Sequence, residues 1–218
     1  MGSFFSNPLN DQFIGEDGLM WENAWPEDDL PTLRPAIQDL SITMKGAAHH
    51  LAKHLDKFLR DKLPSFDPHY FETTVSLTPK VNSRLIHYYP CKEGFSGQWT
   101  GWHKDLGMLT CLTPALYTDR HGNEISWSDP AVGLHGQTKT GEVVKVNVPK
   151  DCMIIQIGEA MEVLTGGVIK ALPHAVVPLK YVGPGVSPVS RNTMALFIDP
   201  THQDELTIPM ERNEDQLF

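Results

Sequence analysis

The sequence predicts a mainly β protein: a jelly roll, or double-stranded β-helix, with flanking helices and a long N-terminal helix packed on the sheet. Two observations support this fold class. Apolar residues recur in steps of three and four between residues 31 and 60, which is the period of a helix with one buried face. After residue 79, short apolar segments alternate with turns rich in Pro and Gly, a pattern typical of β-sandwiches and jelly rolls.

The composition indicates a single globular domain built from three segments. The chain has 218 residues, of which 40% are hydrophobic and 21% are charged, and such values are ordinary for one soluble domain. We expect residues 1–79 to form an irregular and helical segment packed on the core. Residues 80–200 should form the jelly-roll core, and residues 201–218 an acidic C-terminal tail.

The helices are predicted before residue 79. Residues 1–30 combine acidic runs with several aromatic residues, so we expect irregular backbone that lies against the body of the protein. A second, shorter helix should begin at Asp67-Pro68, an N-cap followed by Pro at the first helical position, and run to about Val75. The long helix that precedes it has its apolar stripe at Leu33, Ile37, Leu40, Met44, Ala47, Leu51, Leu55 and Phe58.

The strands are predicted from short apolar runs bounded by turn residues. A loop with three glycines, residues 91–101, leads into a strand that carries His103. Residues 119–124 have the composition of a hairpin turn. The other strands are expected at residues 84–89, 109–116, 133–137, 143–148, 153–157, 171–177 and 193–197.

Charge, hydropathy and cysteine usage restrict the partners and the compartment. The formal net charge of −9 argues against nucleic acid or an anionic membrane surface as the main partner. No apolar run approaches the roughly 18 residues of a membrane span, and the first residues lack the basic region of a signal peptide. Three widely spaced cysteines are typical of reduced thiols. We therefore expect a cytoplasmic monomer that acts on a small-molecule substrate.

A candidate metal centre is formed by His103, Asp105 and the distant His174. On a strand, successive side chains alternate between faces, so His103 and Asp105 should point the same way. Two imidazoles and one carboxylate on adjacent positions of a metal form the facial triad of non-haem Fe(II) oxygenases, which leaves other positions open for chemistry. The two histidines are 71 positions apart (174 minus 103), so distant strands must meet. The alternative is that His103 is a surface residue and His174 a core histidine with ordinary hydrogen bonds.

Other candidate sites in the sequence are weaker. His50 and His54 stand one helical turn apart on the long helix, but no third ligand accompanies them, and a solvated helix face explains both. The cysteines lack the close spacing of a structural zinc site. The sequence contains neither a Gly-rich phosphate loop nor a Ser nucleophile in a strand–turn–helix context.

Four sequence blocks, spread over residues 80–200, resemble the Fe(II)/2-oxoglutarate-dependent dioxygenase superfamily and, within it, the isopenicillin-N-synthase-like branch. The blocks are residues 84–91, 101–110, 155–176 and 190–197. In this order they are similar to the branch's Asn-Tyr-Tyr-Pro strand, its His-Thr-Asp-x-Gly-x-Leu-Thr block, its run from Asn-Ile-Gly-Asp to His-Arg-Val, and its Arg-x-Ser strand.

The resemblance implies an enzyme and its cofactors. His103, Asp105 and His174 would bind Fe(II), with 2-oxoglutarate as cosubstrate and O2 as oxidant. The implied reaction oxidises a small organic substrate by hydroxylation or desaturation and releases succinate and CO2. Ascorbate is an optional reductant in this scheme. The protein's own part is to hold the geometry and to keep water out of the pocket.

The resemblance also assigns the cosubstrate contacts. Arg191 would pair with the distal carboxylate of 2-oxoglutarate, which suits a planar, bidentate guanidinium. Thr193, in place of the branch's usual Ser, and Tyr89 would add hydroxyl hydrogen bonds. His87 stands where many members have Asn. Longer connections at residues 117–130 and 181–189 are expected to shape the substrate pocket.

Three alternatives remain open from the sequence. An oxidase that uses O2 without 2-oxoglutarate is one, although Arg191 and Thr193 favour the cosubstrate. A non-catalytic jelly-roll binding protein is another, and a cupin-like metal protein, which would need a His-x-His pair, is the third. Relatives in the branch carry a preceding segment of strands and helices, of which we expect only a remnant such as residues 4–9, leaving an open pocket or an unpaired sheet edge.

Overall fold

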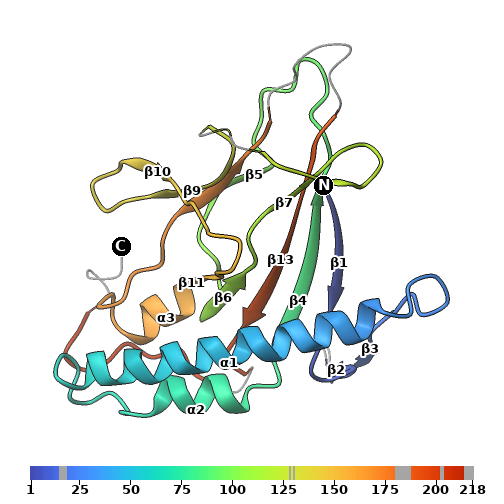
Figure 1. Cartoon of the computed structure of the whole chain (residues 1–218). Coiled ribbons are helices and arrows are strands. Elements are labelled where there is room, and N and C mark those ends of the chain that lie inside the picture. Colours follow the sequence, from blue (N-terminus) through green and yellow to red (C-terminus); the bar gives the residue numbers. More distant parts are fainter. Residues whose placement is uncertain (15–18, 128, 130, 180–187, 202–203, 214–218) are drawn as a thin grey trace.

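The computed structural model covers the 218 residues and describes all of them except 15–18, 128, 130, 180–187, 202–203 and 214–218. Two antiparallel β-sheets make up its centre, and a long helix, α1, lies across the larger sheet (Figure 1). The predicted glycine- and proline-rich loop at 181–189 falls largely outside the described residues, as do parts of the hairpin at 117–130 and of the tail at 201–218.

The larger sheet is built around its longest strand, β13 (Ser190–Ile198). One edge of β13 pairs with β4 (Val81–Tyr88), which in turn pairs with β1 (Gly2–Ser6). The other edge pairs with β6 (Leu109–Leu112) and then with β7 (Leu116–Thr118). The remaining members are β11 (Ile154–Ile157), beside β6, and β8 (Glu124–Ile125), beside β7.

The smaller sheet brings distant strands side by side, as a jelly roll requires. Its strand order is β10 (Val143–Lys145), β9 (Gly133–Gln137), β12 (His174–Val177) and β5 (Thr100–His103). Because β5 pairs with β12, segments about 70 residues apart in sequence become neighbours. The predicted fold class is confirmed. A short hairpin of β2 (Gln12–Ile14) and β3 (Met20–Glu22) stands apart from both sheets.

Helix α1 (Leu33–Arg60) confirms the predicted helix but not every residue of its apolar stripe. Met44 and Ala48 are fully buried against the larger sheet, whereas Leu40 and Phe58 are exposed. The buried stripe includes Ser41 and Asp56, two polar residues that apolar periodicity alone does not detect. Among the helices that the structure describes, none has the length and apolarity needed to cross a membrane.

Helix α2 (Tyr70–Leu77) begins later than predicted because its N-terminal N–H groups find a partner on another helix. The Asp56 carboxylate of α1 accepts hydrogen bonds from the backbone N–H of Phe71 (3.1 Å) and Glu72 (2.8 Å). Asp67, the predicted N-cap, instead accepts the N–H of His69 in the preceding turn (2.9 Å). Burial raises the pKa of Asp56, against the lowering effect of these two N–H groups.

The N-terminal residues are more regular than predicted. Residues 2–6 form β1, in register with β4, so β4 is not an unpaired edge. Phe4, Leu9 and Trp25 pack against the main core, which agrees with the expectation that this segment lies on the body of the protein.

Three further differences concern the later elements. The strand predicted at 109–116 is split into β6 and β7, and the strand predicted at 171–177 begins only at residue 174. The predicted hairpin turn at 119–124 is confirmed, with Gly122 at φ +83°. A short helix, α3 (Glu159–Leu164), was not predicted; it directly follows β11.

Candidate metal centre and adjoining cavity

The three predicted metal ligands come together where the paired strands β5 and β12 meet. His103 is the last residue of β5, and it lies directly opposite His174, the first residue of β12. The expectation that Asp105 shares a strand with His103 is wrong, because β5 ends at His103. The chain then turns towards α3, where the main-chain carbonyl of Asp105 accepts the N–H of Glu159 (2.7 Å).

The potential metal-ligand atoms of the triad converge on one point. One donor atom from each residue lies within 4.8 Å of the others. Oδ1 of Asp105 is 3.7 Å from Nε2 of His103 and 3.8 Å from Nε2 of His174, too far for a hydrogen bond. Each Nδ1 instead bonds a main-chain carbonyl two residues earlier, that of Gly101 (2.8 Å) and of Leu172 (3.1 Å). This second contact fixes each ring and leaves Nε2 free to bind a metal.

The residues fit a divalent metal. Among the described residues, the buried Oδ2 atom of Asp105 has no hydrogen-bond partner, which is costly for a carboxylate unless a cation is bound. Burial lowers the pKa of His174, as does the neighbouring His103, despite the opposing effects of the Leu172 carbonyl and of Asp105. A neutral imidazole is the form that binds metal. His103 is 40% exposed in its side chain, so the centre is accessible from solvent.

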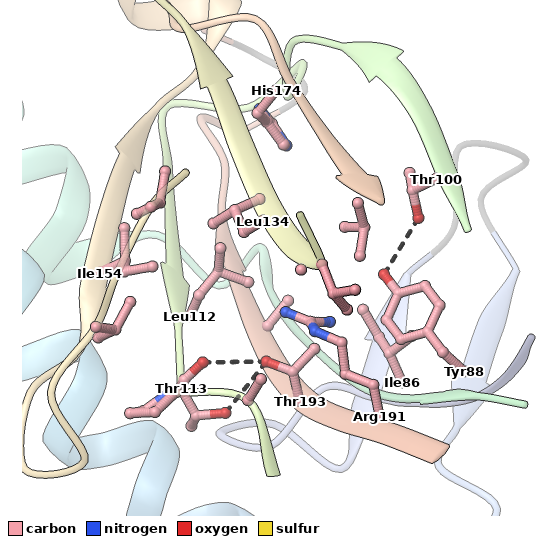
Figure 2. A pocket seen from close by; sticks show the side chains of 18 of the residues that line it. Ile86, Tyr88, Thr100, Leu112, Thr113, Leu134, Ile154, His174, Arg191 and Thr193 are labelled. Atoms are coloured by element: carbon pink, nitrogen blue, oxygen red, sulfur yellow. Dashed lines mark hydrogen bonds between the residues drawn. The ribbon is translucent and has the colours of Figure 1, made fainter. Parts of the chain in front are cut away.

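A cavity of about 280 Å³ extends from the triad between the two sheets. His174 and Arg191 point into it from opposite ends, and apolar side chains such as Leu112, Leu134 and Ile154 form the wall between them (Figure 2). Polar and charged side chains such as Gln156, Lys145 and Asn147 line it as well, so the cavity has both apolar and polar walls.

Arg191 is the buried cation of this cavity. The residue is 5% exposed, and its guanidinium lies 5.1 Å above the ring of Tyr88. Within the described part of the chain, its Nε and Nη1 atoms have no hydrogen-bond partner. A buried guanidinium with two unpaired nitrogen atoms is unfavourable by itself and suited to an anionic ligand such as a carboxylate.

Thr193 and Tyr88 line the cavity, whereas Tyr89 does not. Thr193 shares a face of β13 with Arg191 and donates a hydrogen bond to the carbonyl of Thr113 (3.1 Å). Tyr88 lines the cavity, and its hydroxyl is 3.1 Å from Oγ1 of Thr100 (Figure 2). Tyr89, the predicted contact, follows the last residue of β4, is 56% exposed and does not line the cavity.

Sequence reasoning missed two residues that strand alternation would have found. Tyr88 stands directly opposite Arg191 in the register, so the two share a face of the sheet. Gln156 of β11 is 8% exposed and lines the same cavity; its Oε1 atom lacks a hydrogen-bond partner among the described residues. Both positions follow once the inward face of each strand is known.

The other candidates of the sequence do not form sites. His50 and His54 are exposed on α1. In the part of the chain that the structure describes, the triad is the only group of three or more His, Cys, Asp or Glu residues close enough to hold a metal ion. The three cysteines are free thiols.

Comparison with known proteins agrees with this geometry. The model of the 2OG-Fe(II) oxygenase superfamily matches residues 80–200, which is more than half of the chain. A 2-oxoglutarate-dependent dioxygenase, citB, from Monascus ruber is 28% identical over 178 residues, which are 78% of this chain and 49% of that protein. The chain thus spans about half the length of this curated relative.

Solved structures show the same fold at low sequence identity. A full-length protein of Neurospora crassa, solved in complex with alpha-KG, superposes with a TM-score of 0.67 at 20% identity, covering 98% of this chain and 60% of that one. JOX2 in complex with 2OG, Fe and JA gives 0.64 at 16% identity, covering 96% and 52%. These structures show the fold, and the match to the family model over residues 80–200 establishes that the chain belongs to the 2OG-Fe(II) oxygenase superfamily.

Proposed function

We propose that this chain forms the core of an Fe(II)- and 2-oxoglutarate-dependent dioxygenase that hydroxylates or desaturates a small organic substrate. One observation carries the proposal: a buried guanidinium with unpaired N–H groups shares a cavity with a His–Asp–His triad. Bound Fe(II) would supply the activation of O2 and the oxidative decarboxylation of 2-oxoglutarate to succinate and CO2.

The chain's own residues bind and orient. His103, Asp105 and His174 would hold the metal through two imidazoles and one carboxylate, next to the cavity that all three line. Arg191 would pair with the distal carboxylate of 2-oxoglutarate, because its buried guanidinium lines the cavity and its Nε and Nη1 atoms have no hydrogen-bond partner among the described residues. Thr193, on the same face, fixes the position of this end of the cavity through Thr113.

Tyr88 supports Arg191 by packing, a role different from the hydroxyl hydrogen bond that the family resemblance implies for Tyr89. Its ring packs under the Arg191 guanidinium, which limits the directions the guanidinium can take. Its hydroxyl is held by Thr100, the first residue of the strand that ends at His103. Tyr88 therefore orients the cosubstrate end of the cavity from beneath the guanidinium.

The substrate we infer is a small molecule with a substantial apolar part. Leu112, Leu134 and Ile154 give the cavity an apolar section of wall between the triad and Arg191, which an apolar part of the substrate would cover. Gln156 offers a buried acceptor to an N–H or O–H group of the substrate. The cavity volume of about 280 Å³ suits a small organic molecule rather than a folded macromolecule.

The test is succinate formation by the purified chain under air with Fe(II) and 2-oxoglutarate, with and without a panel of small organic molecules. We expect succinate to form slowly without substrate, to increase with the right one, and to disappear in Asp105→Ala. Iron-dependent oxidation that leaves 2-oxoglutarate unconsumed would identify an oxidase instead. Absence of both activities together with absence of metal binding would identify a non-catalytic member of the fold.

A further inference from the structure

The feature outside the metal and cosubstrate sites that is most closely linked to them is the buried carboxylate of Glu162 on α3. The residue is 3% exposed. Its Oε2 atom accepts hydrogen bonds from Nζ of Lys104 (2.9 Å) and from the backbone N–H of Ala171 (3.0 Å). Its Oε1 atom forms an ion pair with Nζ of Lys170 at 3.1 Å. A single carboxylate thus binds two cations and one main-chain N–H group.

These partners lie on the two segments that carry the triad. Lys104 stands between His103 and Asp105 in the sequence. Its ammonium donates a hydrogen bond to Glu162, which lies 58 residues later in the chain. Lys170 and Ala171 lie just before Leu172, whose carbonyl holds the Nδ1 atom of His174. Glu162 therefore joins the His103–Asp105 segment to the segment that leads into His174.

The backbone of α3 reinforces the same junction. The N–H of Glu159 donates to the carbonyl of Asp105 (2.7 Å), and the N–H of Ala160 donates to that of Gly107 (3.2 Å). Gly158 lies so close to this segment that an added Cβ would come within 2.0 Å of the Gly107 carbonyl oxygen. The segment after β5, which contains Asp105, is thus bound to α3 by main-chain hydrogen bonds and by the contact of Lys104 with the buried Glu162 carboxylate.

Fold stability alone is a poor explanation for this network. Replacing a buried ion pair by apolar residues of similar size is often neutral or stabilising, because the charges lose their hydration. Burial by itself raises the pKa of Glu162, but the hydrogen bonds from Lys104 and the Ala171 N–H, together with the ion pair to Lys170, outweigh it and lower the pKa. The carboxylate is therefore charged at neutral pH, and its directional bonds fix the relative position of two segments.

We propose that Glu162 is a positioning residue for the metal centre, which holds His103 and Asp105 in register with His174 without binding the metal itself. This inference rests on the proposed role of the triad as an Fe(II) site. Partners that orient metal ligands typically change metal affinity by about 10–100-fold when they are removed. Because Glu162 acts through Lys104 and the main chain, we expect the lower end of that range, about 10-fold.

The experiment measures the dissociation constant of Fe(II) anaerobically, by competition with a chromogenic chelator, for the wild type and for Glu162→Gln. The matched control is Asp56→Asn, because Asp56 is an equally buried carboxylate (2% exposed) that accepts two backbone N–H groups between α1 and α2. The melting temperature of each apo protein is recorded alongside. We expect about 10-fold weaker Fe(II) binding in Glu162→Gln and less than about 2-fold change in Asp56→Asn.

A second variant keeps the test decisive if Glu162→Gln does not fold. Lys104→Met, at a side chain that is 22% exposed, removes one arm of the network. It should weaken Fe(II) binding, and Lys104→Arg should restore most of the affinity. If Glu162→Gln does fold, the double variant should lose little more than Glu162→Gln alone, because the two changes share the Lys104–Glu162 contact.

Equal changes in the Glu162 and Asp56 variants, or unchanged affinity in Glu162→Gln and Lys104→Met, would overturn the positioning role while the Fe(II) site stands. A wild-type chain that binds no Fe(II) would instead overturn the proposed function, and the positioning role with it. The two failures are distinguished by the wild-type titration alone.

Discussion

The two faces of β13 lie in different environments, one in the apolar core and the other on the cavity. On one face, Met194, Leu196 and Ile198 are at most 4% exposed and pack in the apolar core under α1. On the other face, Arg191 and Thr193 are also buried, yet they line a cavity and carry polar groups. Strand geometry makes successive residues alternate between these environments.

The difference separates stability from chemistry along a single strand. Burying a large aliphatic side chain contributes roughly 1.5–3 kcal/mol, so the helix-covered face stabilises the fold. A buried polar group without a hydrogen-bond partner costs about 1–3 kcal/mol, so the cavity face lowers the stability of the fold. If this account is right, substitutions on the two faces should affect different measurements.

The largest expected effect is on metal binding. His174→Ala should weaken Fe(II) binding by more than about 100-fold, because it removes a ligand rather than a residue that orients one. Isothermal titration under anaerobic conditions measures this loss. The urea midpoint of the apo protein should change little, and an unfolded His174→Ala protein would contradict the separation of the two roles.

A pair of matched leucine substitutions compares core and cavity directly. Leu196→Ala should lower the free energy of unfolding by about 2–5 kcal/mol, because Leu196 is fully buried and its removal leaves an empty space. Leu134→Ala should cost less, because Leu134 already borders a cavity. Urea denaturation provides both values, and equal losses would show that the cavity face contributes as much to stability as the core.

Replacing the buried cation Arg191 should weaken 2-oxoglutarate binding without lowering the stability of the apo protein. Arg191→Met removes a guanidinium whose Nε and Nη1 atoms lack partners among the described residues. We expect the apo protein to be unchanged or more stable by about 1 kcal/mol. Thermal unfolding in the absence and presence of 2-oxoglutarate checks this, since only the wild type should be stabilised by the ligand. A clear loss of apo stability would mean that Arg191 is a structural residue.

The smallest effect concerns a thiol on the helix-covered side. Burial raises the pKa of Cys111 to about 12, so at pH 8 roughly one molecule in ten thousand carries the thiolate. Iodoacetamide should therefore label the exposed Cys152 first and Cys111 only after unfolding, as followed by mass spectrometry. Leu196 lies opposite Cys111 in the register, so Leu196→Ala should speed the labelling of Cys111. Rapid labelling in the wild type would show that this core opens easily.

Sequence patterns predicted what depends on local periodicity and residue type. The period of α1, the alternation within β13 and the triad itself were all visible in the sequence, the last strengthened by the family resemblance. Partners supplied by other elements were not visible. Asp56 of α1 accepts the N–H groups at the start of α2, and the carbonyl of Asp105 accepts the N–H of Glu159, so Asp105 lies beyond the end of β5.

Two features of the site depend on how distant segments pair. Tyr89 was chosen from its place in a motif, but the register of β4 against β13 directs Tyr88 into the cavity. Glu162 lies in the block of residues 155–176, but the block does not predict its role, which depends on Lys104 and Ala171 that only the folded chain brings to its carboxylate. Side-chain direction and tertiary hydrogen bonds are set by the pairing of distant segments, which one sequence does not reveal.

The most direct test of the account is an anaerobic titration of the apo protein with Fe(II) and then 2-oxoglutarate, followed by visible absorption. The account predicts a weak metal-to-ligand charge-transfer band in the wild type, and Arg191→Met that binds Fe(II) normally but needs far more 2-oxoglutarate to develop the band. Iron binding without the band, or an identical 2-oxoglutarate dependence in both proteins, would contradict the claim that the triad and Arg191 form one site.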